Sequence, residues 1–216
     1  MTYLIETYKS YFTDKRFVST FSVALVLFVA SLFVNFYAGI YATENVSNSV
    51  TDMFLSNVRV FNVEDIFVYG TFVFWWFVLI LGFLKPQRFP FALKSIALFT
   101  LIRSVFITLT HLGPFPNQII IDPASILNEF VFGGDLFFSG HTGLPFLLAL
   151  IFWDNKNLRV IFLISSVIFG LTVLLGHLHY SIDVLSAFFI TYSIYHIALF
   201  LWPEDKNLFI HGLEPV

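Results

Sequence analysis

Two short segments of the sequence combine histidine with groups that can assist it. In residues 176–183, which read Gly-His-Leu-His-Tyr-Ser-Ile-Asp, His179 precedes Asp183 by four positions. On a helix this spacing puts the imidazole and the carboxylate on one face, one turn apart. A carboxylate in that place can accept the Nδ1 proton and leave Nε2 free as a nucleophile or base.

The second segment, residues 133–143, reads Gly-Gly-Asp-Leu-Phe-Phe-Ser-Gly-His-Thr-Gly. Ser139 and Gly140 are expected to open a helix, whose unpaired N–H groups and dipole suit a phosphate. His141 falls in the same turn, and Asp135 precedes it as a headgroup contact, a support for His141 or an ordinary loop carboxylate. Two assisted histidines beside an anion site are the groups needed for phosphoryl transfer through a phosphohistidine.

The composition places these segments in a membrane protein. Of 216 residues, 58% are hydrophobic, 20% aromatic and 12% charged, whereas soluble proteins have about 25% charged residues. Half the usual charge leaves too little polar surface to cover a water-soluble globule. A net charge of −3 argues against a nucleic-acid partner, and the absence of Cys excludes disulfides, thiolate nucleophiles and Cys-ligated zinc.

Long apolar runs predict an all-α integral membrane protein with six transmembrane helices in one bundle. Five runs cover residues 17–41, 66–84, 91–112, 158–176 and 184–202. A sixth, 136–153, reaches spanning length only by including the polar Ser-Gly-His-Thr-Gly stretch. We therefore expect an interfacial amphipathic segment at 1–16, a six-helix catalytic domain at 17–202 and a cytoplasmic tail at 203–216.

The positive charges predict which way the bundle faces, because cytoplasmic loops are enriched in Lys and Arg. With both termini cytoplasmic, Arg59 falls outside and Arg103 lies within the third span. The other nine fall inside: Lys9, Lys15, Arg16, Lys85, Arg88, Lys94, Lys156, Arg159 and Lys206. This asymmetry places both histidine segments on the extracytoplasmic side, which is periplasmic, extracellular or lumenal.

The residue patterns of both segments resemble the motifs of a known family. Ser-Gly-His-Thr and His-Tyr-Ser-Ile-Asp resemble the paired motifs of the type-2 phosphatidic acid phosphatase superfamily. Gly-Gly-Asp-x-x-x-Ser-Gly-His-Thr, together with His-Tyr-Ser-Ile-Asp-Val, looks most like its sphingomyelin synthase branch, and the resemblance covers residues 103–192. It implies that His179 is the nucleophile, that Asp183 orients it, and that His141 protonates the leaving group and later activates the acceptor.

Departures from the phosphatase branch bear on the substrate. That branch has a Lys-x6-Arg-Pro motif and an Arg six residues before the nucleophilic His, where this chain has Val173. A phosphomonoester carries close to two negative charges and usually needs several cations, whereas a phosphodiester headgroup carries one. Acidic residues such as Asp135 and Glu129, with aromatic neighbours, suit a choline or ethanolamine cation.

The expected function is a lipid phosphotransferase or phosphodiesterase with membrane phospholipid and lipid alcohol substrates. It would move a phospho-headgroup from a glycerophospholipid to an alcohol such as ceramide, or to water, with no metal or cofactor in the scheme. A lipid phosphate phosphatase is the alternative, and a metal enzyme using His141, His177 and His179 or a lipid carrier stays open. Arg103 is expected either to bind phosphate or to form an internal salt bridge.

Overall fold

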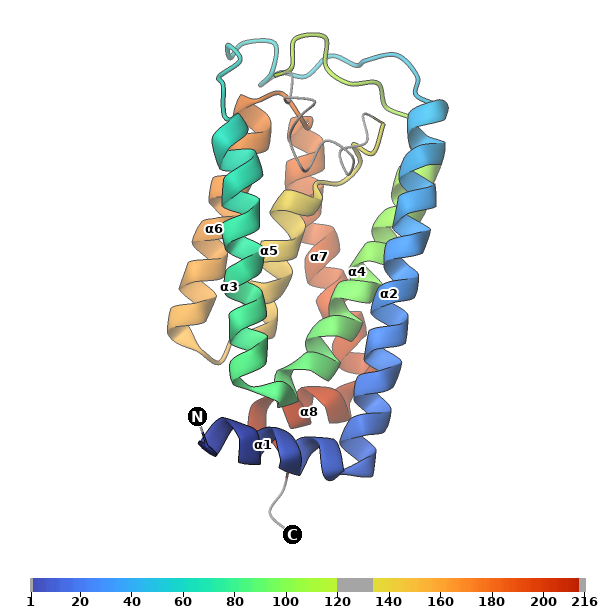
Figure 1. The fold of residues 1–216 in the computed structure, drawn as a ribbon. Coiled ribbons are helices and arrows are strands. Elements are labelled where there is room, and N and C mark those ends of the chain that lie inside the picture. Colours follow the sequence, from blue (N-terminus) through green and yellow to red (C-terminus); the bar gives the residue numbers. More distant parts are fainter. Residues whose placement is uncertain (1, 120–133, 214–216) are drawn as a thin grey trace.

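The structure is a computed structural model that describes residues 2–119 and 134–213. Figure 1 shows an upright bundle with two short helices, α1 and α8, lying across one end. Every regular element in the described part of the chain is helical, which confirms the all-α prediction. The elements are α1 (Thr2–Thr13), α2 (Lys15–Glu44), the π-helix η1 (Ile66–Gly70), α3 (Thr71–Leu84), the 3₁₀-helix η2 (Pro86–Arg88), α4 (Phe89–Leu109), α5 (Gly140–Ile151), α6 (Lys156–Leu175), α7 (Ser181–Leu201) and α8 (Pro203–His211).

Five segments of the described chain are long and apolar enough to cross a membrane, so this is a multi-pass membrane protein. They are α2, η1 with α3, η2 with α4, α6 and α7. The sixth predicted run, 136–153, contains α5, which has only 12 residues. Such a helix is about 18 Å long, against about 30 Å for a hydrocarbon core. The count of six spans and the orientation in the membrane therefore stay predictions.

The short helix α5 forms the centre of the bundle, where it contacts α4, α6 and α7. Leu147, Leu148 and Ile151 on α5 have no exposed surface. Around them pack aromatic side chains of the neighbouring helices, including Phe99 of α4 and Phe162 of α6. Because neighbouring helices enclose it, α5 can bury its apolar residues without reaching spanning length.

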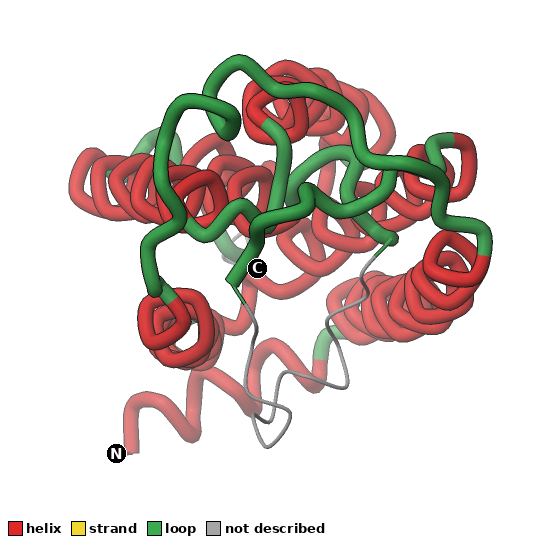
Figure 2. Tube along the Cα trace, turned by 90° about the horizontal axis from the view of Figure 1, so that it is seen from above, coloured by secondary structure: helices red, strands yellow, loops and turns green. Residues whose placement is uncertain are grey.

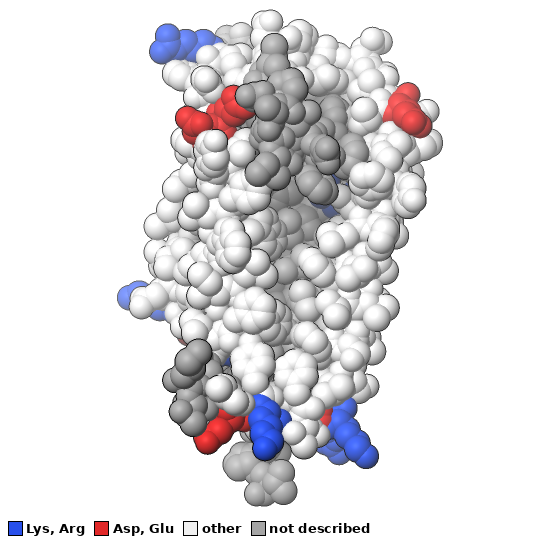
Figure 3. All heavy atoms as spheres, in the orientation of Figure 1, with Lys and Arg blue, Asp and Glu red and all other residues white. Residues whose placement is uncertain are grey.

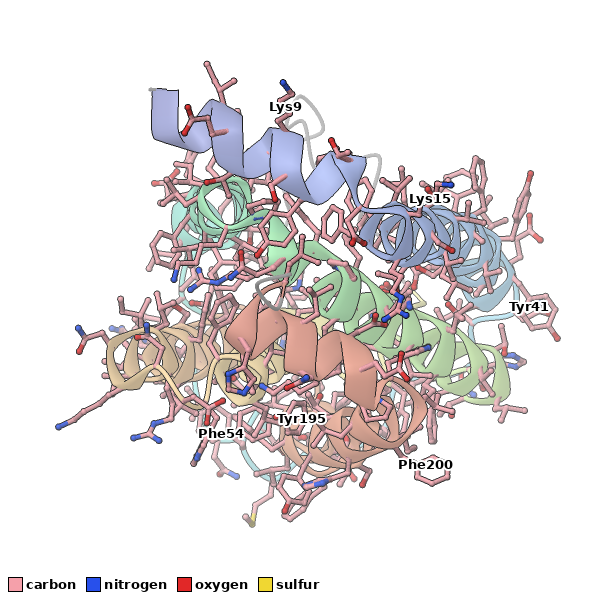
Figure 4. The ribbon with its side chains drawn as sticks, turned by 90° about the horizontal axis from the view of Figure 1, so that it is seen from below. Lys9, Lys15, Tyr41, Phe54, Tyr195 and Phe200 are labelled. Carbon is pink, nitrogen blue, oxygen red and sulfur yellow. The ribbon has the colours of Figure 1, made fainter. Side chains whose placement is uncertain are left out.

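At the end of the bundle opposite the histidine segments, α1 and α8 lie across the helix ends (Figure 4). The Tyr8 hydroxyl of α1 donates to the carbonyl of Phe83 in α3 at 2.9 Å. The Tyr11 hydroxyl accepts from the N–H of Leu213, just beyond α8, at 3.3 Å. The predicted interfacial segment is therefore bound to the bundle by two of its tyrosines, and the predicted tail contains a packed helix.

A buried polar cluster joins α8 to the bundle. The Lys94 ammonium of α4 lies 2.5 Å from Oδ2 of Asp205 in α8. It also donates to Oγ1 of Thr20 in α2 at 2.8 Å, and that hydroxyl donates to Oδ1 of Asp205 at 2.7 Å. The two charged side chains are 6% and 7% exposed. Each is therefore paired and hydrogen-bonded, as a charge removed from water requires.

The surface charges agree with a helical bundle in lipid. On the face drawn in Figure 3, charged side chains gather toward the two ends, and the wide surface between them is largely uncharged. Large apolar side chains are exposed along the spanning helices, such as Val26 at 67%, Val73 at 69% and Phe200 at 83%. Apolar exposure of this extent fits contact with acyl chains rather than water.

We expect Asp205→Ala to lower the free energy of unfolding by about 3–5 kcal/mol, because it leaves the Lys94 ammonium buried without its partner. Unfolding of the purified protein in detergent measures this loss. Asp154→Ala is the matched control: Asp154 pairs with Lys206 at 3.7 Å but is 68% exposed, so its loss should stay below about 1 kcal/mol. Equal losses in the two variants would contradict the assignment.

Candidate active site

The two histidine segments meet at the end of the bundle opposite α1 and α8. Helices α5 and α7 both begin there, and Figure 2 looks down on this end, where loops cross the helix termini. The N–H of Ser139, just before α5, donates to the carbonyl of Asp183 in the first turn of α7 at 3.1 Å. A main-chain hydrogen bond thus ties the starts of the two helices together.

His179 is held by groups from both segments. Its Nδ1 lies 2.9 Å from the carbonyl oxygen of Leu136 and 3.5 Å from Oδ2 of Asp183. With the proton on Nδ1, the ring donates to that carbonyl beside the carboxylate, and Nε2 keeps its lone pair. The predicted pair is therefore brought together. The sequence missed the closer partner, the Leu136 carbonyl.

The geometry of this pair differs from the expected one. His179 and Asp183 were placed on one helical face, but α7 begins only at Ser181, with Tyr180 as its N-cap residue. His179 therefore lies before the helix, and the chain turn at Tyr180 brings it over the first turn. Oδ2 of Asp183 also accepts from the N–H of Tyr180 at 2.9 Å, so one oxygen caps the helix and faces His179.

His141, the second residue of α5, lies between aromatic rings. Its imidazole centroid is 4.4 Å from that of Phe67 in η1 and 6.5 Å from that of Phe169 in α6. Within residues 2–119 and 134–213, the His141 ring has no hydrogen-bond partner, and it is only partly buried. Burial lowers the pKa of His141, and the charges of His179 and Arg103 lower it further. A phosphate anion beside the ring acts in the opposite direction, because a negative charge favours the imidazolium. The ring is thus oriented by aromatic contacts while its nitrogens stay available.

Phe67 was not predicted from the sequence. It is 4% exposed and belongs to the π-helix η1, which contacts α6. Single turns of π-helix occur often at functional sites. One Phe among 30 gives no sequence signal for such a contact.

Ser139 and Gly140 were both expected to bind phosphate, but they have different roles in the structure. Ser139 is fully buried as the N-cap of α5, and its hydroxyl oxygen accepts from the N–H of Thr142 at 3.4 Å. Its own N–H is bound to Asp183, so Ser139 organises the turn. The N–H groups of Gly140 and His141, at the start of the helix, are the donors left for an anion.

Arg103 reaches the site because the stretch before α5 lies against it, and α4 ends at Leu109 rather than at residue 112 as predicted. Its Nε donates to the carbonyl of Phe138 at 3.0 Å. Its Nη2 donates to the carbonyl of Asp135 at 2.6 Å and pairs with Oδ2 of the same residue at 3.1 Å. A Cβ on Gly140 would lie 3.5 Å from the Arg103 Nε. The guanidinium thus forms the internal salt bridge, next to the first turn of α5.

Asp135 is a partner of Arg103 in this arrangement. Burial raises the pKa of the Asp135 carboxyl, while the charges of Arg103 and His179 oppose that rise. Glu129, the other acidic residue considered for a headgroup cation, lies outside the described residues. Among the residues that the structure does describe, no group of three His, Cys, Asp or Glu side chains could hold a metal ion.

Tyr180 and His177, which lie close to His179 in the sequence, are both buried. The Tyr180 hydroxyl donates to the carbonyl of Gly113 at 2.7 Å and accepts from the N–H of Val50 at 3.2 Å. Burial raises the pKa of Tyr180, so its phenol stays protonated and able to donate. His177 has a left-handed φ of 56° and packs its ring 5.3 Å from that of Phe115. Both residues pack the turn before α7 against the loops at this end of the bundle.

One part of the chain, which carries both histidine segments, matches a known protein family. Residues 133–199 match the family model described as PAP2 superfamily C-terminal. This part of the chain is similar to the PAP2 superfamily C-terminal domain. No curated protein and no solved structure matches the chain. The PAP2 match spans α5, α6 and nearly all of α7, and so includes His141, His179 and Asp183.

The match confirms the resemblance at the level of the superfamily. It indicates an activity of the lipid phosphatase or phosphotransferase type, with lipids as substrates. It covers none of α1 to α4, so Arg103 and Phe67 reach the site from outside the PAP2 segment. The match does not assign the chain to the sphingomyelin synthase branch of that superfamily.

We expect Gly143→Ala to lower both stability and activity, because α5 lies close to α4 and α7 at this residue. A Cβ there would lie 2.7 Å from the Phe99 ring and 2.9 Å from Oγ1 of Thr191. Overpacking of this kind costs about 1–3 kcal/mol, measurable by unfolding in detergent. Gly70→Ala is the control, since its Cβ would meet nothing closer than 3.4 Å. Equal behaviour of the two variants would refute this account.

Proposed function

We propose that this protein is a membrane lipid phosphotransferase or phosphodiesterase that works through a phosphohistidine. The donor is a glycerophospholipid, and the acceptor is a lipid alcohol such as ceramide, or water. The observation that carries the proposal is the state of His179, whose Nδ1 is bound at 2.9 Å by the Leu136 carbonyl. An imidazole protonated and held at Nδ1 presents Nε2 as its nucleophilic atom.

The second requirement is an acid that can reach the leaving oxygen. His141 meets it, because it starts the neighbouring helix α5, has no described hydrogen-bond partner and remains partly exposed. Gly140 and His141 also supply main-chain N–H groups, which with the α5 dipole can hold the phosphate oxygens. The proposed roles are therefore nucleophile for His179, orienting carboxylate for Asp183 and acid, then base, for His141.

The charge at this end of the bundle supports a diester rather than a monoester. In the sequence, Arg59 and Arg103 are the sole cations of the outer half under the predicted topology. Arg59 is exposed and lies over the Phe61 ring at 4.8 Å. The charge of Arg103 is compensated by Asp135 at 3.1 Å. Little net positive charge is left to bind a doubly charged phosphate, whereas a singly charged diester needs less.

The proposed reaction has two steps, formation and breakdown of the phosphohistidine. Nε2 of His179 attacks phosphorus, the bond from phosphorus to the glycerol oxygen breaks, and protonated His141 gives that oxygen its proton, releasing diacylglycerol. The acceptor hydroxyl then loses its proton to His141 and attacks phosphorus, which breaks the N–P bond and frees His179. Stabilisation of the developing oxyanion falls to the N–H groups at the start of α5.

A lipid phosphate phosphatase is the second candidate, and the PAP2 superfamily match favours it directly. The same two histidines would serve, with a phosphomonoester as donor and water as acceptor. The two candidates differ in substrate, so they are separable by what the enzyme releases. Inorganic phosphate from phosphatidate would support the phosphatase. Diacylglycerol from a phosphodiester, with or without headgroup transfer, would support the transferase or phosphodiesterase.

We expect His179→Ala to abolish turnover and His141→Ala to lower it by about 10²–10⁴-fold, the usual contribution of a general acid or base. The assay uses purified protein with labelled ceramide plus phosphatidylcholine or phosphatidylethanolamine, and separately with phosphatidate. His196→Ala is the matched control, because His196 is an exposed histidine nearer the other end of α7, in edge-to-face contact with the Tyr192 ring at 4.4 Å. It should keep wild-type activity.

Several results would count against this function. Phosphate release from phosphatidate, with no diacylglycerol formed from either diester, would replace the proposal by the phosphatase. Activity retained in His179→Ala would exclude the phosphohistidine. Conversely, a labelled headgroup that stays bound to the wild-type protein after denaturation, but not to His179→Ala, would support the phosphohistidine.

A further inference from the structure

The loop that follows α2 places a buried carboxylate against the start of α7. Asp52 is 7% exposed. Its Oδ2 accepts hydrogen bonds from the N–H of Ser181 at 2.8 Å and from the Ser181 hydroxyl at 2.6 Å. Its Oδ1 accepts from the N–H groups of Phe54 and Leu55 at 2.8 and 3.0 Å. The carboxylate is therefore held by its own loop on one side and by α7 on the other.

The bonds from Asp52 fall on the turn that carries His179. Ser181 is the first residue of α7, and the N–H groups of a first turn have no partner inside the helix. Asp183 binds the N–H of Tyr180, and Asp52 binds the next one, that of Ser181. A negative charge at this end is also favoured by the helix dipole. Two carboxylates thus cap successive residues directly after His179.

We propose that Asp52 is a positioning residue for His179. By fixing Ser181, it keeps the turn at Tyr180 closed, so that Nδ1 of His179 stays at the Leu136 carbonyl and beside Asp183. The catalytic meaning of this role rests on the proposed function. The geometric role does not, because it concerns hydrogen bonds present before any substrate binds.

The same loop supports the turn at a second point. The N–H of Val50 donates to the hydroxyl of Tyr180, which donates in turn to the carbonyl of Gly113. Leu55 packs with Tyr180 and Leu136 in one small apolar cluster. Residues 50–55 therefore contact both segments that hold His179, the turn before α7 and the stretch before α5. Asp52 supplies the charged part of this contact.

The protonation state of Asp52 fits the role. Burial acts to raise its pKa, but the hydrogen bonds from Ser181, Leu55 and Phe54 outweigh burial, and the pKa is lowered. The carboxylate is therefore charged at neutral pH. Because the folded-state pKa lies below the ordinary Asp value, the stability it adds is present above that value and is lost as pH falls through the lowered pKa.

The first arm of the test records the Nδ1–H resonance of the His179 imidazole by NMR, in wild type, Asp52→Asn and Asp65→Asn. This proton lies between the Leu136 carbonyl and the Asp183 carboxylate. If Asp52 closes the turn, Asp52→Asn weakens the hydrogen bond to Leu136, so the resonance should move upfield and exchange faster with water. The control Asp65, the residue before η1, is exposed, and its variant should give the wild-type resonance.

Asp52→Glu separates position from charge, because it keeps the carboxylate but lengthens the side chain. A displaced Nδ1–H resonance of His179 in this variant as well is the expected result. A wild-type resonance in Asp52→Glu, with a displaced one in Asp52→Asn alone, would mean that only the charge of Asp52 matters and would overturn the proposal. A wild-type resonance in both variants would overturn it too, as would the same displacement in Asp65→Asn.

The second arm measures turnover of the lipid substrate against pH. Asp52→Asn should lower kcat by about 10–100-fold, as expected for a hydrogen bond to a charged group, with KM little changed. Asp65→Asn should keep the wild-type kcat. Lower thermal stability with an unmoved Nδ1–H resonance and a wild-type kcat in Asp52→Asn would assign Asp52 to folding alone and would overturn the proposal. An inactive wild type would defeat the proposed function, while the NMR arm would still decide the role of Asp52.

Discussion

The site depends on the register between the starts of α5 and α7. Two hydrogen bonds set it: the Ser139 N–H to the Asp183 carbonyl, and His179 Nδ1 to the Leu136 carbonyl. Both join the stretch before α5 to the first turn of α7, and both use main-chain groups. A shift of either helix by one residue would break both bonds at once. The position of His179 is thus set by backbone geometry, and Asp183 reinforces it.

The shortness of α5 makes that register possible. A full span would carry its N-terminus to the membrane surface, whereas 12 residues enclosed by α4, α6 and α7 begin inside the protein. The first turn of α5 therefore lies beside Arg103 of α4, whose Nε would be 3.5 Å from a Cβ at Gly140. Gly143 lets α5 approach α4 and α7 closely in the same turn, because a Cβ there would lie 2.7 Å from the Phe99 ring and 2.9 Å from Oγ1 of Thr191. Packing around one glycine thereby helps to place the proposed phosphate site within the bundle.

Sequence patterns predicted the parts of this arrangement that depend on residue type. Apolar length located the five spans, and the spacing of His179 and Asp183 predicted their meeting. The Leu136 carbonyl could not be found that way, since every residue has one. Nor could Asp52 be told from the exposed acid Asp65, because both are outer-loop aspartates and only the fold buries one of them. The start of α5 was predicted from its N-cap, Ser139, but the run 136–153 was counted as a span because its apolar residues continue on both sides of that cap.

Helix α4 carries two buried cations, and both are neutralised by acids from the C-terminal half of the chain. Lys94 pairs with Asp205 at one end, and Arg103 pairs with Asp135 near the other. The Arg103–Asp135 pair joins the segment that matches the PAP2 model, residues 133–199, to α4, and the Lys94–Asp205 pair joins α8, which lies beyond the match, to the same helix. They also leave Arg103 with little charge to give a ligand. Binding of a phosphate would then fall largely to uncharged N–H groups at the start of α5, donors better matched to one negative charge than to two.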